Sequence, residues 1–191
     1  MMHKRYGPPA QQMPRHPRLA RAIALLQAVG ADNHPHTHGR SLLGHLVGTA
    51  QLLIAWNAPI ATVLAGLCHS IYGTNAFRPV SLPRHQRQRL RNAIGPRAEH
   101  IVWLFANLRR PATLERAMRS HRTLVRQRSG RTRHCRLDDL QQLFVLECAN
   151  LADQAPRRQQ LSELRALAKR AAPQLRNMHA GLDRFVRQAA R

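Results

Sequence analysis

Apolar residues recur at helical spacing through much of the chain, and two consecutive apolar segments lie near its centre. In the first, from Leu42 to Trp56, apolar side chains return every three or four positions, which is typical of an amphipathic or largely buried helix. In the second, Pro59 is suited to open a helix because its fixed φ fits a first turn, and the apolar stripe continues to Tyr72. The pattern therefore predicts two neighbouring helices, with Gly73 ending the second.

Segments with the same periodicity predict further helices on both sides of this pair. They cover residues 18–31, 84–94, 96–108, 138–155, 157–171 and 173–190. Leu, Ala, Arg and Gln are abundant in the chain, whereas Val and Ile are sparse, and this balance favours helices over strands. We expect an all-α fold, a single helical bundle of about seven to nine helices.

Length and composition indicate one domain preceded by a polar arm. The chain has 191 residues and is 43% hydrophobic, enough for one substantial core. Residues 1–17 hold four prolines and no apolar periodicity, which predicts a disordered basic arm, and residues 18–191 form the helical domain. We interpret residues 18–31 as a core helix rather than a signal peptide, because Arg21 and Gln27 interrupt the apolar run. No stretch reaches the roughly 18 apolar residues that span a bilayer.

The chain is strongly basic. Its formal net charge is +22, from 31 Lys and Arg against 9 Asp and Glu, and a field of this size attracts polyanions. Nearly all of the basic residues are Arg, a skew that genomic base composition explains as well as phosphate contacts do. The charge is consistent with a small anionic ligand and with nonspecific nucleic-acid binding, and the sequence does not indicate an oligomeric state.

The cysteines indicate neither a disulfide framework nor a zinc ribbon. Cys68, Cys135 and Cys148 are far apart and form no C-x-x-C motif, so a reducing cytoplasm is the simplest location. Cys135 lies between His134 and Arg136 and could have a lowered pKa, but we do not expect it to be catalytic.

Two histidines fall in the two central helices. His45 lies on or beside the inner face of the first helix, and His69 lies in the last turns of the second. Imidazole is a versatile metal ligand because it binds while neutral. Taken singly, such histidines are more often ordinary core or surface residues, and the His-rich tract 33–38 before the first helix is more simply a solvated loop.

The sequence AGLCHSIYGTNAF around His69 resembles a family of HD-like proteins that carry HSIYGT in place of the His-Asp pair. The wider likeness is to the HD-domain metal-dependent phosphohydrolases, and more distantly to guanosine tetraphosphate hydrolase domains. A later helix supplies an aspartate in these proteins, and ECANLADQ resembles that helix, with Asp153 in the matching place. The resemblance covers roughly residues 38–155.

The resemblance implies a metal centre of His45, His69 and Asp153, a ligand set compatible with Zn, Mn or Fe. The chain departs from the pattern at Ser70, which replaces the aspartate of the His-Asp pair, and the acidic pair of the hydrolases is also missing, since Gly73 and Thr74 stand there. Glu147, Asn150 and Asp153 recur every three residues, which by itself is expected of a solvent-facing stripe.

Other side chains near this site are candidates for substrate contacts. His38 and Arg40 are expected to border it, with the planar fork of Arg40 suited to phosphate oxygens. Tyr72, Thr74 and Asn75 either position a substrate or water for catalysis or only cap the helix and bind the loop backbone. The basic segment 109–136 is either a solvated charged face or a phosphate-collecting rim.

Two functions remain open at this point. The first is an HD-like, metal-dependent phosphohydrolase that acts on a small phosphorylated or anionic metabolite, with metal-activated water and charge neutralisation by arginine. The second is a catalytically degenerate HD-like domain that binds a ligand, nucleic acid or a partner protein, because Ser70 removes one anionic ligand.

Overall fold

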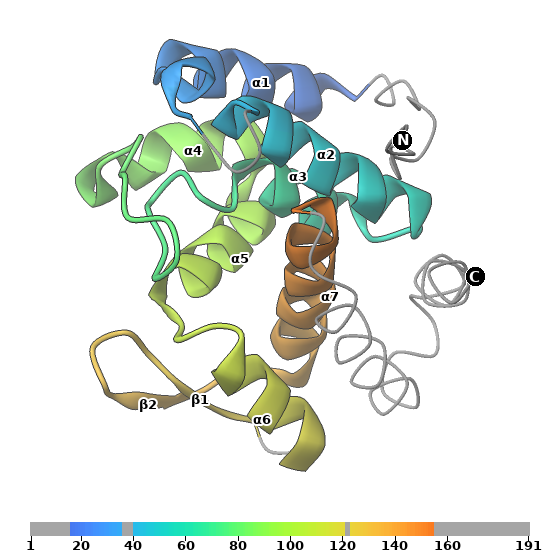
Figure 1. The fold of residues 1–191 in the computed structure, drawn as a ribbon, viewed down its shortest axis with the longest axis vertical. Helices are drawn as coiled ribbons and strands as arrows, with labels where there is room; N and C mark the ends of the chain where they lie inside the picture. The colour runs from blue at the N-terminus through green and yellow to red at the C-terminus, as the bar shows by residue number, and fades with distance from the viewer. Residues whose placement is uncertain (1–15, 36–39, 121–122, 155–191) are drawn as a thin grey trace, which may run out of the picture.

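The computed structural model describes residues 16–35, 40–120 and 123–154 of the chain. Within them the fold is mostly helical, with a small two-stranded sheet added (Figure 1). In chain order the elements are α1 (Pro17–Ala28), η1 (Ala31–Asn33), α2 (Leu42–Ala55), α3 (Ile60–Cys68), η3 (Arg84–Gln86), α4 (Arg87–Ile94), α5 (Pro96–Asn107), α6 (Ala112–Ser120), β1 (Leu124–Arg126), β2 (Thr132–His134) and α7 (Leu137–Asp153).

The apolar periodicity predicted α1, α2, α4, α5 and α7, and it predicted α3 with a later end, because α3 ends at Cys68 and not just before Gly73. It did not predict α6, which lies in the segment 109–136 that was expected to be a charged face or rim. α2 begins after Ser41, whose hydroxyl accepts a hydrogen bond from the backbone N–H of Gly44, a typical N-terminal cap. Pro96 occupies the first turn of α5, where its missing N–H is not needed. The expected basic arm, apart from its last residues, and the expected helices over 157–171 and 173–190 lie outside the described residues.

Four helices surround the part of the core that holds the site. α2 and α3 form a helical hairpin, α7 packs against both of them, and α5 packs against α3 and α7; Figure 1 shows α7 running beside this group. Gly66 allows α2 and α3 to approach closely, because a Cβ there would overlap the Leu53 side chain. The largest buried side chains include Leu46, Leu53, Leu64, Leu67, Phe105 and Phe144.

The two-stranded sheet was not predicted. β1 and β2 pair antiparallel, with Val125 opposite Arg133, inside the basic segment that was expected to be a charged face or rim. Each strand has only three residues, and Val125 is the buried member of β1. So short a strand has no apolar alternation from which it could be recognised.

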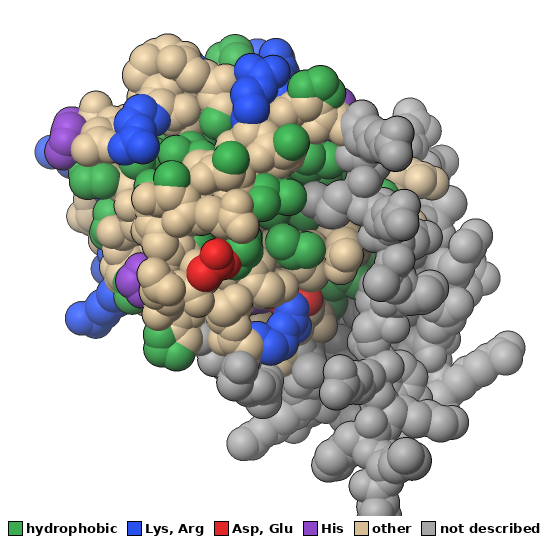
Figure 2. Space-filling view, turned by 90° about the horizontal axis from the view of Figure 1, so that it is seen from above, with side chains coloured by type: hydrophobic (Ala, Val, Ile, Leu, Met, Phe, Trp, Pro, Cys, Tyr) green, Lys and Arg blue, Asp and Glu red, His purple; other side chains and the backbone are tan. Residues whose placement is uncertain are grey.

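Seen from above, over α1 and α2, the arginine side chains are separated from one another by apolar and uncharged atoms (Figure 2). Among the residues that the structure describes, this face therefore carries no continuous basic patch. In the part of the chain that the structure describes, no helix combines the length and the apolarity needed to cross a bilayer.

Candidate functional site

His45 is held inside the bundle by a carboxylate. It lies on α2, one turn after Ser41, and its side chain is 2% exposed. An ionised carboxylate can only accept hydrogen bonds, so Nδ1 of His45 donates to Oδ2 of Asp153 across 2.6 Å. This contact orients the opposite ring nitrogen, Nε2, toward the protein interior.

His69 is oriented in the same way by a backbone carbonyl. It is the first residue after α3 and is buried. Its Nδ1 lies 2.7 Å from the carbonyl oxygen of Gly66, and because a carbonyl only accepts, Nδ1 carries the hydrogen. The imidazole also packs edge to face against Phe105, with ring centroids 5.3 Å apart. Its Nε2 therefore carries a lone pair when the ring is neutral.

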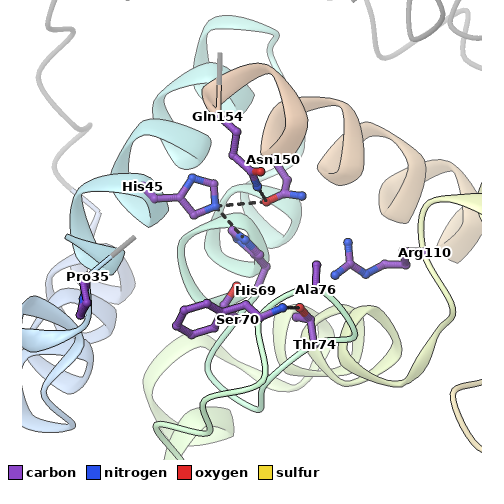
Figure 3. A pocket seen from close by; sticks show the side chains of 10 residues that line it. Pro35, His45, His69, Ser70, Thr74, Ala76, Arg110, Asn150 and Gln154 are labelled. Atoms are coloured by element: carbon purple, nitrogen blue, oxygen red, sulfur yellow. Dashed lines mark hydrogen bonds between the residues drawn. The ribbon is translucent and has the colours of Figure 1, made fainter. Parts of the chain in front are cut away.

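The two Nε2 atoms face each other. They are 3.2 Å apart, and Oδ1 of Asn150 lies 3.1 Å from Nε2 of His45 (Figure 3). If both rings are neutral and carry their hydrogens on Nδ1, the two Nε2 atoms and the Asn150 oxygen are all hydrogen-bond acceptors, with their lone pairs directed at one another. Such an arrangement is attractive only with a cation between them, which is either a shared proton or a metal ion.

The spacing fits a metal centre. Two nitrogens bound to one tetrahedral metal at about 2.1 Å lie roughly 3.4 Å apart, close to the 3.2 Å between the imidazoles. An acceptor on the second nitrogen of each histidine is also the usual support of metal-binding imidazoles. His45 and His69 could hold a divalent ion as nitrogen ligands, with the amide oxygen of Asn150 as a third ligand.

Asp153 lies behind His45 rather than at the point where the two Nε2 atoms meet. Its carboxylate contacts Nδ1 of His45 and also forms a salt bridge of 3.2 Å with Arg40. The structure thus brings His45, His69 and Asp153 together as the sequence predicted, but with the carboxylate on the outer nitrogen. Among the residues described, no three His, Cys, Asp or Glu side chains are grouped to hold a metal ion.

The polar side of α7 faces inward. Glu147 and Asn150 are 4% and 7% exposed, so the interpretation of this side as a solvent-facing stripe is wrong for both. Gln154 Nε2 donates to Asn150 Oδ1 at 3.1 Å, and Asn150 Nδ2 donates to Glu147 Oε2 at 3.4 Å. These contacts fix the Asn150 amide with its oxygen toward His45.

A cavity of about 440 Å³ opens beside the histidine pair. This is the size of a small-metabolite site. Its walls combine polar groups with a few apolar side chains (Figure 3). The lining residues are Pro35, His45, His69, Ser70, Thr74, Ala76, Phe77, Arg110, Asn150 and Gln154.

Arg110 enters the cavity wall from the segment after α5. Its Nη1 forms an ion pair with Oε2 of Glu147, its Nε donates to the carbonyl oxygen of Phe105 at 2.9 Å, and its guanidinium lies 3.4 Å from the centroid of the Phe105 ring. Burial lowers the pKa of Arg110 and the Glu147 carboxylate raises it, but an arginine keeps its charge in proteins. A positive group thus stands in the same cavity as the two imidazoles.

The three residues proposed to position a substrate have different locations. Thr74 lines the cavity, and its Oγ1 accepts from the Phe77 N–H at 2.9 Å. Tyr72 does not line it, because its hydroxyl donates to Glu99 at 3.1 Å in another part of the core. Asn75 donates to the backbone carbonyl of Arg110 at 2.8 Å, so it fixes the loop to the Arg110 backbone.

The two predicted substrate-binding residues are not both within the described part of the chain. Arg40 is 44% exposed, binds Asp153 and the Gly44 carbonyl, and is absent from the cavity wall. His38 lies outside the described residues. Ser70, which replaces the aspartate of the His-Asp pair, is buried and lines the cavity.

The sequence did not single out Asn150 or Arg110 as functional. Asn150 is one turn from Asp153 on the same side of α7, and this spacing was a usable signal. Arg110 is one arginine in a run of basic residues, and nothing in its local sequence distinguishes it.

Cys135 contradicts the expectation of a lowered pKa. It is 5% exposed, and burial raises the pKa of its thiol to about 11, with a further increase from Asp139. Burial likewise raises the pKa of Cys68 to about 12 and that of Cys148. All three thiols are free and buried, as expected of small apolar side chains.

The fold and the site define a mostly helical protein with a two-histidine cavity. Residues 25–110 match the model of a domain of unknown function, DUF6817. The match contains His45, His69 and Arg110 but ends before α7. No curated protein and no solved structure matches the chain. The description of DUF6817 names no activity, so the resemblance to HD-domain hydrolases remains a prediction.

Proposed function

We propose that this protein is an HD-like, divalent-metal-dependent hydrolase acting on a small anionic or phosphorylated metabolite. The observation that carries the proposal is the 3.2 Å approach of the His45 and His69 Nε2 atoms, each with its Nδ1 hydrogen bound to an acceptor. The free thiols are consistent with work in the reducing cytoplasm. Mn, Zn and Fe all accept two imidazoles.

Each residue of the proposed site has a separate role. His45 and His69 would hold the ion, and Asn150 would supply an amide oxygen. A bound ion would activate water for attack on the substrate. Asp153 keeps His45 in the tautomer that presents Nε2, as carboxylates hydrogen-bonded to metal-binding histidines do. Ser70 and Thr74 present hydroxyl groups to the same cavity, where they can position substrate oxygens.

His69→Ala tests the proposal most directly, because it removes one nitrogen ligand. We expect about one equivalent of Mn, Zn or Fe per wild-type chain after loading, and metal affinity lowered at least about a hundredfold in the variant. His100→Ala is the matched control, since His100 is 40% exposed and contacts Asp139 instead of the cavity. Elemental analysis measures the metal bound per chain, and competition with a chelator measures the affinity. Phosphate release from small phosphomonoesters measures the activity.

Wild-type protein that stays metal-free under all three loading conditions would refute the metal centre. Equal metal affinity in His69→Ala and wild type would refute this assignment of ligands.

A second candidate function is binding of nucleic acid by a catalytically inactive domain. It rests on the hairpin formed by β1 and β2. Arg126, Arg128, Arg131 and Arg133 are exposed there, and no Asp or Glu occurs between Thr123 and Arg136. A two-stranded ribbon with such charge is suited to phosphate contacts. This function requires neither the metal nor the cavity, so variants separate the two candidates.

A further inference from the structure

We propose that Arg110 forms an oxyanion-binding subsite in the cavity, placed to hold a carboxylate or phosphate oxygen of the ligand whose other end meets the two histidines. The inference rests on the proposed function, because it names the ligand chemistry of the same cavity. It depends on a side chain that the metal centre does not use.

The guanidinium is rigidly held before any ligand arrives. Its side chain is 4% exposed, its face lies on Phe105, and its Nε and Nη1 are bound to the Phe105 carbonyl and to Glu147. Nη2 makes no hydrogen bond within the described part of the chain, and Arg110 lines the cavity. Figure 3 shows the guanidinium pointing from its side of the cavity toward Ala76. A fixed N–H donor is thus directed into the space where a ligand would lie.

The remaining donors of the cavity favour the same ligand chemistry. Ser70 and Thr74 carry hydroxyl groups on the wall, and Thr74 Oγ1 already accepts from the Phe77 N–H, so its hydrogen is available to donate. Hydrogen bonds from a guanidinium to a charged oxygen are about twice as strong as those between neutral groups. The wall therefore suits an oxygen-rich anionic group.

Glu147 sets a limit on the charge that this subsite accepts. Its carboxylate is buried beside Arg110 and accepts a hydrogen bond from Nη1, so the net charge of the ion pair is close to zero. One ligand oxygen can bind Nη2 of Arg110. A bidentate contact that also uses Nη1 would have to displace Glu147. Removal of the Glu147 charge should consequently strengthen anion binding.

A second arginine of the chain provides a matched control. Arg87 also lies over an aromatic ring, 3.9 Å from the Trp103 centroid, and pairs with the buried Glu99 through bonds of 2.7 and 2.8 Å. It does not line the cavity. Arg110→Lys and Arg87→Lys both preserve the net charge and replace the guanidinium partner of a buried carboxylate with an ammonium, so we expect them to affect nonspecific anion binding equally.

The test titrates metal-free, chelator-treated protein separately with inorganic phosphate and with acetate. Amide shifts of cavity residues Ser70, Thr74 and Ala76 in ¹H–¹⁵N spectra report binding in the cavity rather than at other arginines. We expect at least one anion to bind wild type and Arg87→Lys alike, and to bind Arg110→Lys at least about tenfold more weakly. The anion that binds identifies the ligand group as phosphate or carboxylate.

Glu147→Gln provides a second measurement if Arg110→Lys does not fold. We expect it to bind the anion about threefold or more tightly than wild type, while Glu99→Gln, which makes the same change outside the cavity, leaves binding unchanged. Equal binding in Arg110→Lys and wild type, no shift of the cavity amides with either anion, or unchanged affinity in Glu147→Gln would each overturn the subsite. Because the protein is metal-free throughout, these results do not depend on whether His69→Ala loses metal.

Discussion

At the residue scale, the position of Asp153 depends on a glycine. A Cβ on Gly48 would overlap the Asp153 carboxylate and lie 2.9 Å from Arg40 Nη2, so the absence of a side chain allows α7 to bring its last turn against α2. Gly44, one turn earlier on α2, has room for a methyl group, with the nearest atom, Ser41 Oγ, at 3.4 Å. These two glycines therefore have different roles.

Gly48→Ala should displace the Asp153 carboxylate and weaken its hydrogen bond with Nδ1 of His45. We expect metal affinity, measured by chelator competition, to fall about tenfold or more, in the range for loss of a carboxylate that supports a metal-binding histidine. Gly44→Ala should leave metal affinity unchanged and stabilise α2 by about 0.5 to 1 kcal/mol, since alanine is the better helix former. Equal metal affinity in Gly48→Ala and wild type would show that Asp153 does not support the site.

At the scale of elements, the sequence predicted what depends on apolar periodicity. α2, α3, α5 and α7 were all recognised, because each buries an apolar face against the others. The β1–β2 hairpin and the inward direction of Glu147 and Asn150 were not predicted, since both depend on tertiary contacts. A polar stripe has the same sequence pattern whether it meets solvent or, as here, a buried arginine and histidine.

The start of α2 allows a test of how local signals support the site. Ser41→Ala removes the acceptor of the Gly44 N–H, a bond of 3.1 Å, and should lower the free energy of unfolding by about 1 kcal/mol. Urea denaturation measures this change. Ser41→Asp keeps an acceptor at the cap and should restore stability; a loss as large as that in Ser41→Ala would contradict the capping role.

At the scale of the whole molecule, the net charge of +22 is not gathered on the face seen in Figure 2. Among the described residues, exposed arginines follow one another without an intervening Asp or Glu in the β1–β2 hairpin and also over residues 84–91. For the site, the sequence pointed to both histidines and to Asp153, but it assigned Asp153 as a metal ligand, whereas this carboxylate lies on the outer nitrogen of His45. It could not predict Arg110, whose role comes from Phe105 and Glu147, residues on different helices.

If the hairpin binds nucleic acid, its affinity for a short duplex should fall steeply with added salt. Arg131→Gln combined with Arg133→Gln should reduce the slope of log affinity against log salt by about 2, because two phosphate contacts are lost. Fluorescence anisotropy at several salt concentrations measures this slope. His69→Ala should bind as wild type does, and affinity that does not change with salt would count against the hairpin as a phosphate-binding surface.

The bond between His45 and Asp153 joins positions that are 108 residues apart. Neither partner can orient the other until α7 has docked, so the two imidazoles gain their final geometry only when the tertiary structure is complete. The imidazole resonances of His45 should then serve as a built-in reporter of global unfolding. A relative that shares only the stretch matching DUF6817 would need another source for the backing carboxylate.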